Sequence, residues 1–181
     1  FTMAREAAQM EGKGRAEHQT LLISQTGAAI TGAKGMRVSA EKSFSQIKHL
    51  DVLVVPGGQG TRREVENPEM LRFIAQVSRG AEWVTSVCTG AMLLTAAGPA
   101  RGKRVTTHWA FCQALRERGE ASEVLDGVRY VRDGNVVTAA GVSAGIDMAL
   151  WLLGQIDDPP FARMVQKFME YDPAPPYAAA V

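Results

Sequence analysis

The sequence contains few of the residues that mark disulfide-bonded or metal-binding proteins. Its 181 residues include two cysteines, Cys88 and Cys112, which are too few for a disulfide framework. Three histidines, His18, His49 and His108, are scattered without the spacing typical of metal ligands. We therefore expect free thiols and no metal ion.

An excess of charge of one sign is also missing. The chain has 20 lysine and arginine residues against 19 aspartate and glutamate residues, a formal net charge of +1. This balance gives no reason to expect a nucleic acid or an anionic membrane as a partner. No apolar run has the length of a membrane span, and no secretory signal peptide is visible. Two thiols without an export signal indicate a reducing compartment, so we expect a cytoplasmic protein.

The chain does have the composition and the pattern of one globular domain over residues 1–181. Its hydrophobic share of 46% and charged share of 22% are ordinary for such domains. Apolar, β-prone runs at residues 51–56 and 83–87 alternate with helical patterns, such as the one that Asn67 caps and Pro68 begins. This alternation predicts an α/β fold with a mostly parallel sheet sandwiched between helices.

Two patterns make specific predictions about the second half of the chain. Residues 128–132 and 135–138 are β-prone, which predicts a hairpin with a two-residue turn at Asp133-Gly134. Residues 141–145 are small and predict a loop that leads into a very apolar helix over residues 146–153. Such a helix is expected to pack on several sides.

The stretch from Trp83 to Leu94 has the features of a sharp turn from a strand into a helix, with Cys88 at its apex. Small residues at Ser86 and Gly90 allow the strand and the helix to cross without a clash, as in a nucleophile elbow. The positive end of the helix favours the thiolate, which is the form that attacks electrophiles. We therefore predict that Cys88 is a nucleophile; a buried core cysteine is the alternative. Cys112 lies on a predicted helix face without such a turn, and we expect it to be inert.

Three loops are expected to meet near this cysteine. Reactive groups in parallel sheets gather beyond the carboxyl ends of the strands. The loops in question are Pro56-Gly57-Gly58, Cys88-Thr89 and Gly141-Val142-Ser143. The backbone amides of Gly58 and Thr89 are candidates for an oxyanion-hole pair. A plain turn is the alternative interpretation of the two glycines.

Several motifs resemble the ThiJ/PfpI superfamily, which has a flavodoxin-like, glutamine-amidotransferase-like fold. They are Pro56-Gly57-Gly58, Val-Thr-Ser-Val-Cys-Thr-Gly at residues 84–90, Gly-Lys-Arg-Val-Thr-Thr-His-Trp at residues 102–109, Arg132-Asp133-Gly134-Asn135 and Ala144-Gly145-Ile146-Asp147. The tail from Glu170 to Tyr177, together with Thr-Ser-Val-Cys-Thr-Gly, is similar to the isocyanide hydratase branch. The resemblance is close over residues 50–177 and looser before them.

This resemblance implies a homodimeric cysteine enzyme with a small-molecule substrate. Isocyanide hydratases add water to an isocyanide to give an N-substituted formamide. The resemblance implies that Cys88 attacks the isocyanide carbon to form a thioimidate, with the hydroxyl and amide of Thr89 beside it. It also implies that the Gly58 amide and Gly57 border the pocket and that the Gly141-Val142 backbone forms a wall. No cofactor is implied, because the thiol supplies the covalent intermediate.

The sequence departs from the family pattern at its start. The family begins with a strand inside the sheet and a short loop that carries an acidic residue beside the cysteine, as proton donor and water activator. Neither the strand nor the carboxylate has a counterpart before Phe1. A sheet without that strand would leave a buried strand edge unpaired, which is costly. We therefore expect that this sequence lacks the first strand of its domain.

Two titratable side chains near the predicted site have competing interpretations. His108 stands close to a predicted strand end, so it could reach the pocket and act as a base there. A packed, hydrogen-bonded structural histidine is the alternative. Asp147 lies on the apolar helix, where it could act as an acid. We expect a structural role instead, in which it pairs with a nearby arginine or caps backbone amides.

Two other functions remain open. Similar domains form the sensor half of AraC-type transcriptional regulators, where the cysteine site binds a ligand without turnover. Such a regulator would continue into a helix-turn-helix module, for which this sequence offers neither a segment nor a basic excess. A glyoxalase-like or deglycase-like activity on reactive carbonyls would need His108 in contact with Cys88.

Overall fold

The computed structural model describes residues 1–12 and 18–173, which fall into two compact units. The smaller unit contains the described residues of 1–20 and 149–181, and the larger unit comprises residues 21–148. Each unit has a hydrophobic core of its own.

The smaller unit is helical. It consists of α1 (Thr2–Glu11), the second half of α6 (Val142–Ile156) and α7 (Pro159–Phe168). The Asp158 side chain caps α7 by accepting a hydrogen bond of 2.7 Å from the Phe161 amide, ahead of two prolines that suit the first helical turn. Its core is formed by Ala4, Ala7, Leu153, Phe161, Ala162 and Val165.

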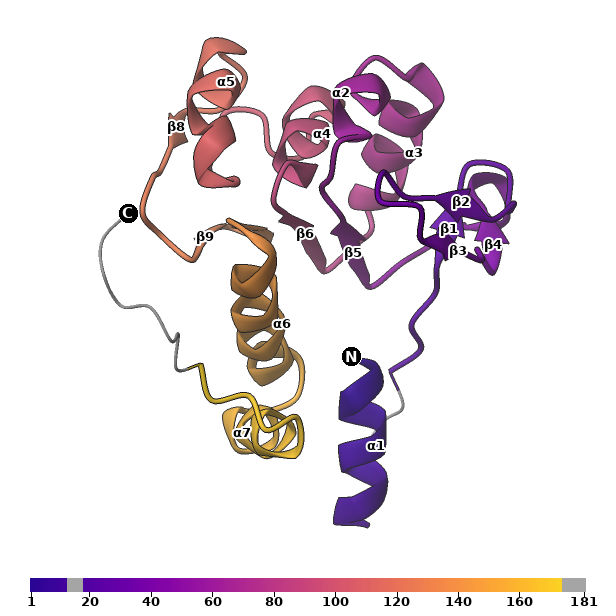
Figure 1. Ribbon diagram of the computed structural model, residues 1–181, viewed down its shortest axis with the longest axis vertical. Helices are drawn as coiled ribbons and strands as arrows, with labels where there is room; N and C mark the ends of the chain where they lie inside the picture. The colour runs from indigo at the N-terminus through magenta and orange to yellow at the C-terminus, as the bar shows by residue number, and fades with distance from the viewer. Residues whose placement is uncertain (13–17, 174–181) are drawn as a thin grey trace. The chain divides into compact units, whose positions relative to one another are not determined.

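The larger unit is built on a four-stranded sheet with the order β5-β6-β10-β9. Strands β5 (Val52–Val55), β6 (Trp83–Val87) and β10 (Val136–Ala139) are parallel, and β9 (Tyr130–Asp133) pairs with β10 in the antiparallel direction. The mostly parallel sheet predicted from the sequence is therefore present. Both apolar runs of the sequence, at residues 51–56 and 83–87, lie next to each other in it (Figure 1).

Short strand pairs complete the larger unit. They are β1 (Ile23–Ser24) with β4 (Lys42–Ser43), β2 (Ile30–Thr31) with β3 (Arg37–Val38), and β7 (Arg104–Val105) with β8 (Glu123–Val124). A 3-10 turn at Phe44–Gln46 lies between β4 and β5. A second 3-10 turn, Trp109–Phe111, and helix α5 (Cys112–Glu117) lie between β7 and β8.

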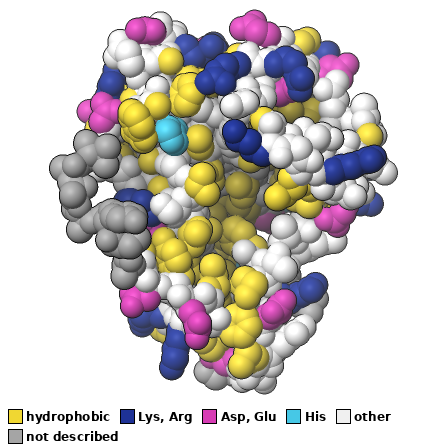
Figure 2. All heavy atoms as spheres, in the orientation of Figure 1, with side chains coloured by type: hydrophobic (Ala, Val, Ile, Leu, Met, Phe, Trp, Pro, Cys, Tyr) yellow, Lys and Arg dark blue, Asp and Glu magenta, His cyan; other side chains and the backbone are white. Residues whose placement is uncertain are grey.

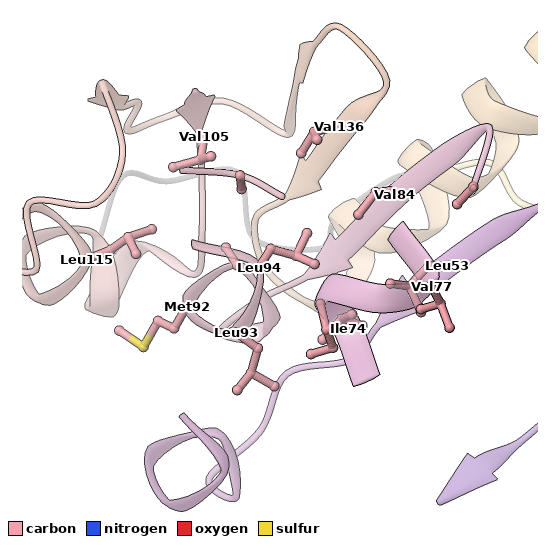
Figure 3. Packing of buried hydrophobic residues seen from close by; sticks show 14 of the residues in the cluster. Leu53, Ile74, Val77, Val84, Met92, Leu93, Leu94, Val105, Leu115 and Val136 are labelled. Atoms are coloured by element: carbon pink, nitrogen blue, oxygen red, sulfur yellow. The ribbon is translucent and has the colours of Figure 1, made fainter. Parts of the chain in front are cut away.

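Helices α3 (Pro68–Ser78) and α4 (Gly90–Ala97) cover one face of the sheet, and the short α2 (Thr61–Glu64) contacts α4. As predicted, the Asn67 side chain caps α3, because it accepts hydrogen bonds from the amides of Glu69 and Met70. The side chains of α3, α4 and the strands form the core between them (Figure 3). Members of this core that are at most 4% exposed are Ile74, Val77, Val84, Ala91, Leu93, Leu94, Ala100, Val105, Cys112, Leu115 and Val136.

Two boundaries differ from the sequence prediction. The hairpin register pairs Asp133 with Val136, so the two-residue turn is Gly134-Asn135 and not Asp133-Gly134. Gly134 takes a positive φ of 65° at the first turn position, which glycine adopts without strain. The apolar helix α6 begins at Val142, four residues earlier than expected, so residues 142–145 form its first turn and not a loop.

Over residues 1–12 and 18–173, no helix combines the length and the apolar character needed to cross a membrane. On the face seen in Figure 2, lysine and arginine side chains are interspersed with aspartate and glutamate side chains. This distribution agrees with the net charge of +1.

Candidate active site

Cys88 lies at a sharp turn between strand β6 and helix α4. Its backbone has a positive φ of 57°, a region that residues with a side chain adopt at a cost, and its side chain is partly exposed. Strained backbones of this kind persist where the surroundings hold them and are common at active sites. The structure thus has the strand, the turn and the helix that the sequence predicted, while the role of Cys88 as a nucleophile stays a prediction.

Hydrogen bonds hold the backbone of Cys88 on both sides. Its amide donates to the carbonyl oxygens of Ala139 at 3.0 Å and Ala140 at 2.7 Å, at the end of β10. Its carbonyl oxygen accepts a hydrogen bond of 2.8 Å from the Thr107 hydroxyl and a longer one of 3.4 Å from the Ala91 amide. The strained turn is therefore tied to two segments that lie far from it in the sequence.

Gly57 and Gly90 allow neighbouring backbones to approach the turn closely. A Cβ atom on Gly57 would lie 2.8 Å from Cys88 Cβ and 2.7 Å from the Thr89 nitrogen. A Cβ atom on Gly90 would lie 2.2 Å from the carbonyl oxygen of Val55. All three distances are shorter than van der Waals contact, so neither position accepts a side chain without a shift of backbone. The predicted need for a small residue at Gly90 is confirmed.

Hydrogen bonds join Gly58 to Thr89. The Gly58 amide donates to Thr89 Oγ1 at 3.0 Å, and Thr89 Oγ1 lies 3.2 Å from the Gly58 carbonyl oxygen, which also accepts from the Thr61 hydroxyl at 2.8 Å. From the sequence, the Gly58 amide is a candidate for an oxyanion hole. In the structure this amide donates its hydrogen bond to Thr89 Oγ1. Its role as an oxyanion-hole donor stays a prediction, and it would require the amide to bond a substrate oxygen in addition to Thr89 Oγ1 or in place of it.

His108 and Gly141 lie together, as expected for two residues of one pocket. A Cβ atom on Gly141 would be in ordinary contact, at 3.6 Å, with Cδ2 of the His108 ring. The His108 Nδ1 atom accepts a hydrogen bond of 3.3 Å from the Ala110 amide, so the ring caps the turn at Trp109–Phe111. No hydrogen bond joins the His108 ring to Cys88 among residues 1–12 and 18–173. His108 therefore has a structural, hydrogen-bonded role, which was the alternative to a role as a base.

Val142 opens helix α6 with a side chain that is 82% exposed. The first turns of α6 are fixed to the sheet by Arg129, which donates to the Ser143 hydroxyl at 3.2 Å and pairs with the Asp147 carboxylate. Of the two structural roles expected for Asp147, the structure shows the pairing with an arginine. The Gly141-Val142 segment is thus anchored on its helical side, whereas its role as a pocket wall stays a prediction.

The two cysteines differ in their surroundings. Cys112 is 2% exposed, and its thiol lies 3.9 Å and 3.8 Å from the carbonyl oxygens of Thr107 and His108. Burial, followed by the hydrogen bond and charge of Asp126, raises the pKa of the Cys112 thiol to about 11. The Cys88 side chain, in contrast, is partly exposed and lies just before the positive end of α4. These surroundings suit Cys88 for reaction and Cys112 for packing.

Within the described ranges, 1–12 and 18–173, no group of three histidine, cysteine, aspartate or glutamate side chains has the geometry of a metal site.

Sequence reasoning missed the part that Thr107 plays in holding Cys88. The Thr107 side chain is buried at 1% exposure and bonds a residue 19 positions earlier in the chain. A threonine beside a predicted strand end, in the motif Thr-Thr-His-Trp, was the available signal, but it does not say which carbonyl the hydroxyl reaches.

Comparison with known proteins gives the relatives of this chain. A family model described as the DJ-1/PfpI family matches residues 3–155. The isonitrile hydratase of Pseudomonas putida is 43% identical over 148 residues, which cover 82% of this chain and 64% of that protein. The chain therefore spans less than two thirds of the length of this relative.

Two further matches agree with this assignment. A ThiJ/PfpI family protein from Pseudomonas syringae of known structure superposes with a TM-score of 0.84 at 31% identity, over 99% of this chain and 74% of that one. The HTH-type transcriptional regulator CdhR of Pseudomonas aeruginosa is 28% identical over 146 residues, which cover 81% of this chain and 43% of the regulator. From the matched family model and these relatives we conclude that the chain belongs to the DJ-1/PfpI family.

Proposed function

We propose that this protein adds water to an isocyanide and releases an N-substituted formamide, with Cys88 as the nucleophile. The observation that carries the proposal is the partly exposed Cys88 on a strained turn, in a chain that is 43% identical to an isonitrile hydratase. Isonitrile and isocyanide are two names for the same group, R–N≡C. The strain at Cys88 supports a functional role, because such backbones are retained mainly where function requires them.

The proposed reaction has two stages, and its atoms balance without a cofactor. In the first, the Cys88 sulfur bonds to the isocyanide carbon while that carbon takes up the proton of the thiol, which gives the thioimidate R–N=CH–S–Cys88. In the second, water adds across the C=N bond and gives R–NH–CH(OH)–S–Cys88. The C–S bond then breaks, the hydroxyl proton returns to the sulfur, and R–NH–CHO leaves.

The neighbours of Cys88 have proposed roles in this reaction. The Thr89 amide and hydroxyl lie next to Cys88, and we assign them to the oxygen of the water-derived group. Gly57 lets its loop pack directly against Cys88 Cβ and the Thr89 nitrogen, which a side chain there would push apart. His108, Gly141 and Val142 take no part in these bond changes, and we assign them to substrate contact.

The test is turnover of a simple alkyl isocyanide, such as cyclohexyl isocyanide, with the formamide measured by mass spectrometry. Formamide that appears with the wild-type protein and disappears in Cys88→Ala supports the proposal. Cys112→Ala is the matched control, because it removes the buried thiol and leaves the turn at Cys88 in place. Full activity in Cys88→Ala, or no formamide from the wild-type protein, would contradict the proposal.

A ligand-sensing role is the second candidate, and the 28% identity to the regulator CdhR is the observation that favours it. A sensor would bind a small ligand at the same turn without consuming it. Saturable binding of an isocyanide or of another small electrophile, with no formamide and with Cys88 recovered unchanged, would favour this role. Carbonyl chemistry of the glyoxalase type has less support, because the His108 ring is engaged with the Ala110 amide.

We further propose that the protein is a homodimer. The support is the family resemblance, together with two large apolar side chains near the candidate site that are exposed in the single chain: Trp109 at 80% and Val142 at 82%. Exposed apolar side chains of this size are typical of surfaces that a partner covers. Sedimentation equilibrium tests the proposal, and a mass equal to one chain at micromolar concentration would contradict it.

A further inference from the structure

Two adjacent threonines, Thr106 and Thr107, form a natural matched pair close to the candidate site. Both are 1% exposed. Each hydroxyl donates a hydrogen bond of 2.8 Å to a backbone carbonyl oxygen, from Thr106 to Leu125 and from Thr107 to Cys88. The two side chains therefore have the same type, burial and bond length, and differ in the carbonyl that they hold.

The carbonyl that Thr107 holds belongs to the peptide group that joins Cys88 to Thr89. This peptide is trans, as are all the peptide bonds of the described residues, so its C=O and its N–H point in opposite directions. Fixing the carbonyl therefore also fixes the direction of the Thr89 N–H.

The Thr89 nitrogen, Cys88 Cβ and Gly57 pack closely together. A Cβ atom on Gly57 would lie 2.7 Å from the Thr89 nitrogen and 2.8 Å from Cys88 Cβ, so a side chain there would displace the Thr89 peptide group. A group bonded to the Cys88 sulfur would lie beside the amide of Thr89, the next residue in the chain. The direction of the Thr89 N–H therefore decides whether a donor is available to such a group.

We propose that Thr107 is a positioning residue, which acts through the Cys88 carbonyl to keep the Thr89 N–H aimed at the adduct on Cys88. For its kinetic part this inference rests on the proposed isocyanide hydration. In the adduct R–NH–CH(OH)–S–Cys88, negative charge develops on the oxygen as its proton leaves and the C–S bond breaks. A fixed N–H donor stabilises that charge, and loss of one such donor typically slows a reaction about 100-fold to 1000-fold.

The experiment compares Thr107→Val, Thr107→Ser and Thr106→Val in isocyanide turnover. Thr107→Val keeps the shape of the side chain and removes its hydroxyl. We expect kcat to fall about 10-fold to 100-fold while KM stays within about twofold, because the donor acts on the transition state and not on substrate binding. Thr107→Ser restores the hydroxyl and should return kcat to within about threefold of wild type. Thr106→Val should retain kcat within about twofold.

A second readout does not depend on the substrate. The backbone amide signal of Thr89 in a ¹⁵N–¹H correlation spectrum reports the hydrogen bonding of its own peptide group. We expect this signal to move in Thr107→Val, to return toward its original position in Thr107→Ser, and to stay in place in Thr106→Val. If Thr107→Val does not fold, Thr107→Ala is the second variant without the hydroxyl.

The outcomes separate the two proposals. No formamide from the wild-type protein, with the Thr89 signal moving as described, would contradict the proposed hydration and support the positioning role. A Thr89 signal that stays in place in Thr107→Val would overturn the positioning role. So would a kcat of Thr107→Val within about twofold of wild type, an equal loss in Thr106→Val, or no rescue by Thr107→Ser.

Discussion

Gly57 lies so close to Cys88 that a Cβ atom on Gly57 would come within 2.8 Å of Cys88 Cβ. The two residues are 31 positions apart in the sequence and follow two neighbouring parallel strands. The missing side chain at Gly57 therefore lets the two turns pack directly against each other.

Gly57→Ala is expected to damage both the stability and the site. The added methyl group would also meet the Thr89 nitrogen and the Val87 carbonyl oxygen, and backbone atoms cannot move aside as a flexible side chain can. We expect a loss of roughly 1–3 kcal/mol in the free energy of unfolding and at least about a 10-fold loss of turnover. Urea unfolding and the isocyanide assay measure the two effects. Gly60→Ala is the control, since a Cβ atom there meets nothing within 4 Å and φ is −61°; equal losses in both variants would contradict the explanation.

The strained backbone at Cys88 predicts that glycine is the better replacement there. Cys88→Gly and Cys88→Ala both remove the thiol, but alanine must keep a Cβ atom at a φ of 57°. The left-handed region costs a residue with Cβ about 1–2 kcal/mol, whereas glycine loses about 0.5–1 kcal/mol through its greater freedom when unfolded. We therefore expect Cys88→Gly to be more stable by about 0.5–1 kcal/mol in urea unfolding.

A position within a helix provides a control at which replacing alanine by glycine should lower stability instead of raising it. Ala75→Gly, in the middle of α3, should lower the free energy of unfolding by about 1 kcal/mol, because glycine has no strain to relieve there. A Cys88→Ala protein that is as stable as Cys88→Gly would show that the turn is not strained in solution.

The contrast between the two thiols predicts selective alkylation. Burial raises the pKa of the Cys112 thiol to about 11, so at pH 8 this side chain is both protonated and inaccessible. Iodoacetamide should modify Cys88 in the native protein and both cysteines after unfolding in urea. Peptide mass spectrometry distinguishes the two sites. Modification of Cys112 in the native protein at a rate similar to that of Cys88 would contradict the burial argument.

Glu120 predicts a loss of stability at acid pH. Its burial tends to raise the pKa of the carboxyl, but hydrogen bonds from Arg118 and Thr95 outweigh this effect and hold the pKa below its ordinary value of 4.5. The unfolded chain therefore binds a proton at this group more readily than the folded protein. The stabilisation is fully present above pH 4.5 and is lost as the pH falls through the lower folded value.

Glu120→Gln should remove this pH dependence. We expect the variant to have a free energy of unfolding about 1 kcal/mol below that of the wild type at pH 7. This difference between the two proteins should shrink as the pH falls from 5 to about 3. Urea unfolding at each pH measures the difference. Glu123→Gln is the control, because the Glu123 side chain is 52% exposed and its ion pair with Arg104 contributes little. A difference in the free energy of unfolding between Glu120→Gln and wild type that stays constant with pH would contradict the lowered pKa of Glu120.

Local features of the fold were predictable because they depend on neighbouring residues. The Asn67 cap and Pro68 start of α3 follow from side chains that bond the next amides and from a fixed φ. The strand from Trp83 to Val87 and the helix from Gly90 follow from residue periodicity and from the small residues between them. The start of α6 was placed four residues too late, because glycine and serine near a helix start favour a loop when they are read alone.

The α/β class, the turn at Cys88 and the need for small residues around it could be predicted from the sequence, since they follow from residue pattern and local sterics. Which distant groups meet that turn, in contrast, depends on the tertiary structure. Thr107 reaches Cys88 across 19 positions, and the Gly58 amide finds Thr89 across 31. A hydroxyl or an amide can bond any carbonyl or hydroxyl that packing brings within reach, so its partner is fixed by how the strands and loops fold together and not by the residue type.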